Sequence, residues 1–276
     1  MRHRKFAYIS TYQDKVPGSP YINLLRILFE NRLWSIRGQK SQLNKTSALN
    51  KYIFRPGESY IFWNHITKTN FNRSFMPMPA VKTDRVRLRS FFEKLVKLQG
   101  REKLTFKITG PTRLAYLDSI FPDAEYVLIK RNPLDNIKSL LQVKFYADRK
   151  DKIWWDSENI YSEDEKLFME KHKKSEFGVA SLQYYKIHEI YEKEKKSLGL
   201  EDRILEVNYE DFIKDPKEIV SKILQRVGYE IDDSVEEYLE SLKIYNRNRK
   251  DNFFGSPEIE KEVIDISING VKNTQL

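Results

Sequence analysis

A short buried strand that runs directly into a helix constrains this chain more than any other feature. The apolar run 127–129 is of the kind found in a strand covered on both faces. Asn132 suits the cap of the following helix, and Pro133 suits its first turn, where a missing backbone donor costs nothing. The pattern predicts a strand over 125–131, a helix over 133–146, and a ligand-binding edge where the two meet.

Two polar side chains flank this junction. Arg131 falls at the carboxyl end of the predicted strand, where open α/β sheets place their ligands, and Ser139 follows within the helix. A guanidinium and a hydroxyl beside a helix N-terminus suit a bound phosphate. The alternative interpretation makes Arg131 a surface salt-bridge partner and Ser139 an exposed helix residue.

Predicted strands and helices alternate along much of the chain. Further helices are expected over 22–33, 86–99, 113–120, 182–198 and 216–227, with strands over 104–108 and 203–207. Such alternation favours a parallel sheet with right-handed crossovers. With 276 residues, 40% of them hydrophobic, the sequence suffices for one α/β domain over residues 1–276.

The charge of the chain suits an anionic ligand without identifying it. Lysine and arginine total 49 against 40 acidic residues, a net charge of +9. The basic residues are scattered and often alternate with acidic ones, as on solvated helix faces. The densest basic patches, 2–5 and 247–250, match no nucleic-acid-binding motif, so nucleic-acid binding is kept only as a third hypothesis.

Residue types also limit the kinds of site. The absence of cysteine excludes disulfides and thiolate metal sites, and no histidine or carboxylate cluster has metal-ligand spacing, so we predict no metal. No run of about 20 apolar residues is present, and nothing near Met1 resembles a signal peptide. We expect no transmembrane segment in this chain and take the cytoplasm as the default location, which an upstream targeting segment would change.

Three segments, in order, resemble the sulfotransferases that use 3′-phosphoadenylyl sulfate (PAPS). Residues 107–124 include Phe-Pro-Asp-Ala before the strand, 131–139 match the family's 3′-phosphate motif, and 207–212 resemble its Tyr-Glu-Asp motif. Residues 48–63 also resemble bacterial and carbohydrate-type members. The resemblance implies a P-loop-NTPase-like fold of three layers, a parallel sheet flanked by helices. It also implies PAPS as co-substrate and a hydroxyl or amine acceptor, with carbohydrate as one class.

The resemblance assigns roles to particular residues. Lys107 matches a lysine that stabilises the transferring group, and its alternative role is a strand-end residue facing solvent. Arg131 and Ser139 would bind the 3′-phosphate. Tyr209 would contact the adenine or, alternatively, pack in the core. Arg247 lies in a basic, aromatic tail that resembles the segment closing over the nucleotide in this family.

The residue that would accept the proton of the acceptor stays open. Family members use Glu, His or Asp, and the candidates are Asp14, Glu58 and His65, each with a structural alternative. Asp14 falls near the point where tyrosylprotein-type relatives carry a catalytic glutamate. The charged, tryptophan-containing segment 148–178 is expected to be a lid or acceptor-binding insertion, or simply to cover the edge of the core.

One family element is not found. These enzymes begin with a strand and a loop such as Pro-Arg-Ser-Gly-Thr-Thr, whose amides and basic side chain bind the 5′-phosphosulfate. Residues 18–20, Gly-Ser-Pro, lack the basic residue and the glycine-threonine turn, and 3–10 resemble what normally follows the first helix. We therefore expect a chain that lacks the N-terminal strand-loop-helix unit and is inactive as given. The alternative is a non-catalytic nucleotide-binding module of the same fold.

Overall fold

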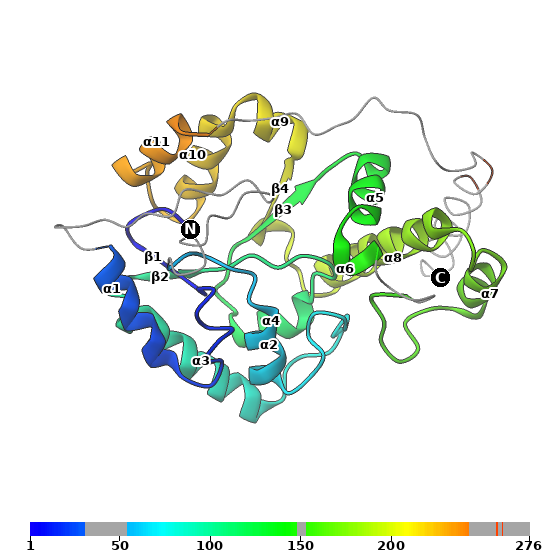
Figure 1. Cartoon of the computed structure of the whole chain (residues 1–276), viewed down its shortest axis with the longest axis horizontal. Coiled ribbons are helices and arrows are strands. Elements are labelled where there is room, and N and C mark those ends of the chain that lie inside the picture. The colour runs from blue at the N-terminus through cyan, green and yellow to red at the C-terminus, as the bar shows by residue number, and fades with distance from the viewer. Residues whose placement is uncertain (31–53, 148–152, 243–257, 259–260, 262–276) are drawn as a thin grey trace.

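The computed structural model describes residues 1–30, 54–147, 153–242, 258 and 261, and its described part is a mixed α/β fold (Figure 1). Two pairs of parallel strands lie at its centre. The first joins β1 (Phe6–Tyr8) to β2 (Lys103–Thr105), and the second joins β3 (Tyr126–Lys130) to β4 (Ile204–Asn208). Both pairs are parallel, as the alternation of elements predicts, but the described strands form two two-stranded sheets and not one: the strand before Lys107 pairs with β1, which was not predicted, and the strand before Arg131 pairs with β4. The P-loop-NTPase-like, three-layer arrangement stays a prediction.

Helices pack against the two pairs, and most of the helices predicted from apolar periodicity are found. They are η1 (Pro20–Leu24), α1 (Leu25–Phe29), α2 (Tyr60–Thr67), α3 (Lys82–Leu98), α4 (Leu114–Ile120), α5 (Pro133–Leu141), α6 (Lys144–Ala147), α7 (Glu163–Lys171), α8 (Glu176–Ser197), η3 (Glu201–Arg203), α9 (Tyr209–Lys214), α10 (Pro216–Arg226) and α11 (Asp233–Glu240). The expectation that 127–129 is covered on both faces is wrong, because Val127 and Ile129 are 39% and 48% exposed.

Two helix boundaries differ from the prediction for local reasons. The expected helix over 133–146 is divided, because the Gln142 and Val143 amides donate to carbonyls only three residues back and so tighten the end of α5. Helix α8 begins earlier than its apolar pattern suggests, because the Ser175 hydroxyl caps it by accepting from the Gly178 amide at 3.1 Å.

The N-terminal segment contains a strand that the sequence interpretation did not predict, and the absence of the family's own strand-loop-helix unit stays a prediction. The sequence interpretation puts residues 3–10 after a missing strand-loop-helix unit. In the structure, Phe6–Tyr8 is itself a parallel strand beside β2 and leads through a turn-rich loop into η1 and α1. A strand, a loop and a helix therefore follow one another here. The strand escapes detection because its residues are all buried and it is only three residues long, so it has no readable period.

Aromatic side chains dominate the core. The larger apolar cluster lies among β1, α2, α3 and α4 and contains Trp63, which stacks on Phe71 with ring centroids 4.7 Å apart. A second cluster joins α5, α6, α8 and the segment before α7, and it includes Trp155, only 6% exposed. Trp155 is thus a core residue, which supports the simpler of the two interpretations of the tryptophan-containing segment.

Candidate functional site

The first part of the candidate site lies at the carboxyl ends of β1 and β2, where a turn before α2 reaches over the strands. Ser10 forms an antiparallel bridge with Pro56, and the Gly57 amide donates to the Ile9 carbonyl at 3.0 Å. Ser59 then takes a left-handed conformation with φ +53°, and its hydroxyl donates to the Ser10 carbonyl at 3.1 Å. These contacts hold the turn that carries Glu58 against the end of β1.

Lys107 and Glu58, two of the sequence candidates, meet in this turn. Lys107 Nζ lies 2.7 Å from Glu58 Oε1, although the residues come from different segments. Their side chains are 64% and 31% exposed, so the pair is open to a ligand from solvent. An exposed ion pair of this kind contributes about 0–1 kcal/mol to stability. The ion pair therefore contributes little to the stability of the fold, and its two charged groups are accessible to a substrate.

Thr109 and Tyr60 fix the position of this ion pair. The Thr109 hydroxyl donates to the second carboxylate oxygen of Glu58 at 2.8 Å. The Tyr60 hydroxyl lies 2.8 Å from the amide nitrogen, the carbonyl oxygen and the hydroxyl oxygen of Thr109. Burial raises the pKa of Tyr60, so its hydroxyl keeps its proton and remains a donor. Sequence reasoning missed both residues; the signal available for Thr109 was its place two positions after Lys107, in the segment that follows β2.

The other two candidate bases make different contacts. Asp14 Oδ1 accepts from the Phe62 amide at 2.9 Å, in the first turn of α2, and burial raises the pKa of the Asp14 carboxyl. His65, also on α2, lies beside Gly18. Within the described part of the chain, no hydrogen bond or ion pair joins Asp14 or His65 to Lys107. Glu58 is therefore the candidate base that the fold brings to the lysine.

The second part of the site lies at the carboxyl ends of β3 and β4. Lys130 and Asn208 are opposite each other in the strand register, which brings the following residues, Arg131 and Tyr209, together. The Arg131 guanidinium carbon is 5.0 Å from the centroid of the Tyr209 ring, within cation–π range. Two residues predicted separately as nucleotide contacts thus share one edge of a strand pair.

The remaining predicted nucleotide contacts are less constrained. Asn132 caps α5 as the sequence indicates, accepting from the Leu134 and Asp135 amides at 3.0 and 3.3 Å. Ser139 is exposed on the same helix. Arg247 lies outside the described residues. The structure therefore supports the helix start beside Arg131 and leaves the assignments of Ser139 and Arg247 as predictions.

A charged network lies beneath the Arg131 edge. Glu206 on β4 pairs with Lys130 and accepts from Tyr191 Oη at 2.6 Å and Lys195 Nζ at 3.0 Å. Burial opposes ionisation of Glu206, but the hydrogen bonds from Lys130, Tyr191 and Lys195 outweigh it and lower its pKa to about 2. This carboxylate stays ionised and joins α8 to both strands.

The segment after Lys107 is packed tightly from behind. Gly110 has φ +82°, and a Cβ there would lie 2.5 Å from Trp155 Nε1. Arg113 is fully buried, with φ +55°, and its Nε donates to the Ser74 carbonyl at 2.9 Å. The Glu194 carboxylate accepts from the Leu114 amide at 3.0 Å and caps α4. These contacts position the chain that leads away from Lys107.

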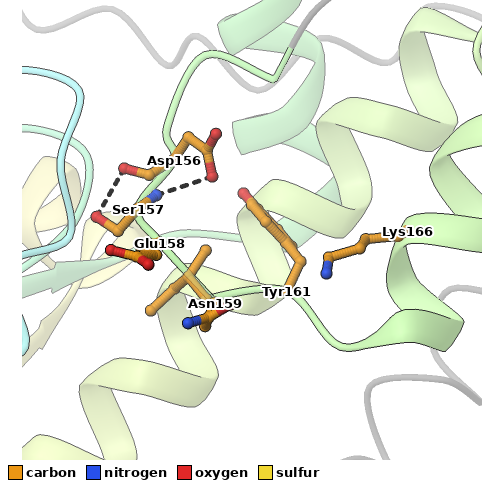
Figure 2. A pocket seen from close by; sticks show the side chains of 7 residues that line it. Asp156, Ser157, Glu158, Asn159, Tyr161 and Lys166 are labelled. Atoms are coloured by element: carbon orange, nitrogen blue, oxygen red, sulfur yellow. Dashed lines mark hydrogen bonds between the residues drawn. The ribbon is translucent and has the colours of Figure 1, made fainter.

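A separate depression lies in the segment before α7 (Figure 2). It has a volume of about 370 Å³, and no sequence-predicted site residue lines it. Its wall exposes both polar and apolar atoms and is formed by Asp156, Ser157, Glu158, Asn159, Ile160, Tyr161 and Lys166. Beneath it, Tyr161 Oη donates to the Trp155 carbonyl at 2.7 Å. The depression thus belongs to the segment expected to bind the acceptor or to cover the core.

No group of three histidine, aspartate or glutamate side chains among the described residues is arranged to hold a metal ion. None of the helices in the described ranges has the length and apolarity that a membrane crossing requires.

Comparisons with known proteins give one family. A model of the sulfotransferase family matches residues 83–233, more than half of the chain. Among solved structures, the sulfotransferase domain from the curacin biosynthetic pathway is similar, with 15% sequence identity and a TM-score of 0.40. The match covers 64% of this chain and 52% of that one, so it spans about half the length of the solved domain. No curated protein matches the sequence.

Proposed function

This chain belongs to the sulfotransferase family, and from that premise we propose that it binds PAPS and transfers its sulfuryl group to a hydroxyl or amine acceptor. The observation that carries the proposal is the pairing of candidates from separate segments. Lys107 meets Glu58 at one strand pair, and Arg131 meets Tyr209 at the other. Each pair stands at carboxyl ends of parallel strands, the edge where α/β proteins bind ligands.

The Arg131 edge suits the nucleotide end of the co-substrate. A guanidinium forms charge-assisted hydrogen bonds to phosphate, and the positive end of the α5 dipole favours the same anion, although the Leu134 and Asp135 amides themselves donate to Asn132. The ring of Tyr209 offers a stacking surface for adenine. Ser139 and Arg247 are proposed as additional contacts, to the 3′-phosphate and along the nucleotide respectively.

The Lys107 edge suits the transfer itself. The acceptor oxygen or nitrogen forms a bond to sulfur, and the bond between sulfur and the bridging phosphate oxygen breaks. The electron pair of that bond remains on the phosphate oxygen, where the Lys107 ammonium stabilises the developing charge. Glu58 takes the proton that the acceptor loses. Asp14 was the other predicted catalytic carboxylate, and its contact at the start of α2 favours a supporting role.

A second candidate is a nucleotide-binding module without transfer activity. The observation that favours it is the loop between β1 and η1, which lacks the basic Gly-Thr-Thr sequence expected of the family. Such a protein would bind adenosine 3′,5′-bisphosphate and PAPS through Arg131 and leave the sulfuryl group in place. The expectation that this chain as given is inactive was made for a sulfotransferase that lacks this loop, and it stays a prediction under either candidate.

Calorimetry with adenosine 3′,5′-bisphosphate and a radiolabelled-sulfate assay across carbohydrate, phenol and amine acceptors test both functions. Arg131→Ala should weaken nucleotide binding by about 2 kcal/mol or more, because a charge-assisted phosphate contact is lost, and Ser139→Ala should weaken it less. Binding without transfer to any acceptor would select the non-catalytic module. Unchanged affinity in Arg131→Ala would contradict the nucleotide assignment itself, and binding of random DNA alone would favour a nucleic-acid-binding protein.

Lys107→Ala separates transfer from binding. If transfer is found, this variant should lower turnover far more than nucleotide affinity, because the lysine charge acts mainly as the phosphosulfate bond breaks. Lys103→Ala, at the opposite end of the β2 segment that leads to Lys107, is the matched control and should change neither. Equal losses of turnover and affinity in Lys107→Ala would reduce the lysine to a binding residue.

A further inference from the structure

The loop from Ser10 to Ser19 lies between the first strand and the first helices of the fold. It follows the parallel strand β1 and precedes η1 and α1, the order in which this family is expected to carry its phosphosulfate-binding loop. A loop of that kind binds phosphate by pointing successive free amides into one concave space. Whether this loop can do so depends on where its amides and carbonyls point.

Most of the amides in the loop already donate to carbonyls. The Gln13 amide bonds to Ser10 O at 2.9 Å, the Lys15 amide to Tyr12 O at 3.0 Å, and the Ser19 amide to Val16 O at 3.3 Å. The Val16 amide bonds to Tyr12 O and the Thr11 amide to Arg55 O, and Pro17 has no amide hydrogen. The remaining amides are not consecutive and cannot form an anion cradle.

The interior of the loop is filled by its own side chain. Gln13 is fully buried, and its Nε2 donates to Val16 O at 2.9 Å and Ser19 O at 3.0 Å, with Pro17 O at 3.4 Å. Inward-pointing groups are therefore carbonyl oxygens, which repel phosphate, and a carboxamide takes the space that an anion would need.

A buried polar network holds Gln13 in this position. Asn23 Nδ2 donates to Gln13 Oε1 at 2.8 Å, and Gln99 Nε2 donates to Asn23 Oδ1 at 2.8 Å. The Gln99 Oε1 in turn accepts from Arg26 Nη1 at 2.7 Å. All four side chains are buried, so turning Gln13 outward would leave several polar groups without partners. The filled loop is thus the stable state of this segment.

We propose that the loop Ser10–Ser19 makes no contact with the 5′-phosphate end of the nucleotide, because Gln13 occupies its interior, and that the protein holds the nucleotide through its 3′-phosphate and base. This inference rests on the proposed nucleotide binding at Arg131. It states which phosphate of the nucleotide each segment binds: the Arg131 edge recognises the 3′-phosphate, and the loop Ser10–Ser19 does not recognise the 5′-phosphate.

Amide hydrogen exchange on the full chain tests the filled loop without any assumption about the nucleotide. Amides of Gln13, Val16 and Ser19 should exchange at the same rate with or without millimolar inorganic pyrophosphate or adenosine 3′,5′-bisphosphate. Gln13→Ala should speed their exchange, because the loop loses its filling side chain. Slower exchange of these amides with either ligand would overturn the proposal, whatever happens at Arg131.

Affinity ratios give the second readout. In a Lys107→Ala background, which removes the attraction of that lysine, adenosine 3′-phosphate should bind within about threefold of adenosine 3′,5′-bisphosphate. Lys15→Ala, which removes the loop's own cation, should leave this ratio unchanged. An advantage of about tenfold or more for the bisphosphate, lost in Lys15→Ala, would show a loop that binds phosphate. Absence of binding by both nucleotides would instead contradict the Arg131 assignment, and the exchange test would still decide the loop.

Discussion

Replacing Gly110 by alanine should destabilise the protein strongly for a reason that the structure makes measurable. The backbone at Gly110 has φ +82°, a conformation that costs an L-amino acid about 1–2 kcal/mol. The new Cβ would also lie 2.5 Å from Nε1 and 2.8 Å from Cε2 of Trp155. Displacing a packed ring in this way adds about 1–3 kcal/mol. Gly110→Ala should therefore lower the free energy of unfolding by about 2–5 kcal/mol.

Gly100→Ala is the matched control. Gly100 also has a positive φ, +61°, but nothing lies within 4 Å of the position of its Cβ, so only the backbone contribution of about 1–2 kcal/mol applies. Urea unfolding of both variants, compared at equal m-values, isolates the contribution of Trp155 as the difference between them. Equal losses in the two variants would refute the close approach of Gly110 and Trp155.

A double-mutant cycle identifies the partner directly. Trp155→Leu replaces the indole ring that Gly110→Ala would displace with a smaller side chain. The double variant should therefore lose less free energy of unfolding than the sum of the two single variants, by about 1 kcal/mol or more. Simple additivity would mean that another group resists the added Cβ. Because Gly110 follows Lys107 by three residues, Gly110→Ala should also reduce any transfer activity that the protein has.

Two further predictions concern hydrogen bonds. Thr109→Val should lower turnover about tenfold in a transfer assay, because Glu58 loses a hydrogen bond to its charged oxygen. Thr109→Ser keeps the hydroxyl and should retain the turnover of the unchanged protein. Equal turnover in the two variants would contradict the positioning role of Thr109. The folded-state pKa of Glu206 is about 2, below its ordinary 4.5, so its stabilisation is complete above pH 4.5 and is lost as the pH falls from there toward 2. Glu206→Gln should therefore reduce the loss of unfolding free energy between pH 4.5 and 2 by about 1–2 kcal/mol, allowing for solvent screening. If urea unfolding shows the same loss in this pH range for both proteins, the network does not stabilise the fold in this way.

The Arg131 junction was predictable because it depends on local signals. An apolar run, a capping asparagine and a proline specify the strand, the helix start and the residue between them. The proximity of Arg131 and Tyr209 then follows from the expectation that both strands end at one edge. The pairing of Lys107 with Glu58 was not predictable at this level. It depends on the turn before α2 crossing the end of β1, and on Ser59 taking a left-handed conformation that its residue type does not require.

The segment around β1 shows how a strand, a loop and a helix can escape detection in a sequence. The loop lacks the glycine-threonine turn, and the strand before it is too short for its period to be read, so both signals indicate that such a unit is absent. The fold nonetheless builds a strand, a loop and a helix here, held by the buried side chains of Gln13, Asn23 and Arg26 and by Gln99 from a distant part of the sequence. A ligand-binding loop leaves its amides free for the ligand, whereas this one uses a glutamine to satisfy its carbonyls. The same topology can therefore persist while the chemistry of the loop is reversed, and only the direction of its hydrogen bonds reveals the difference.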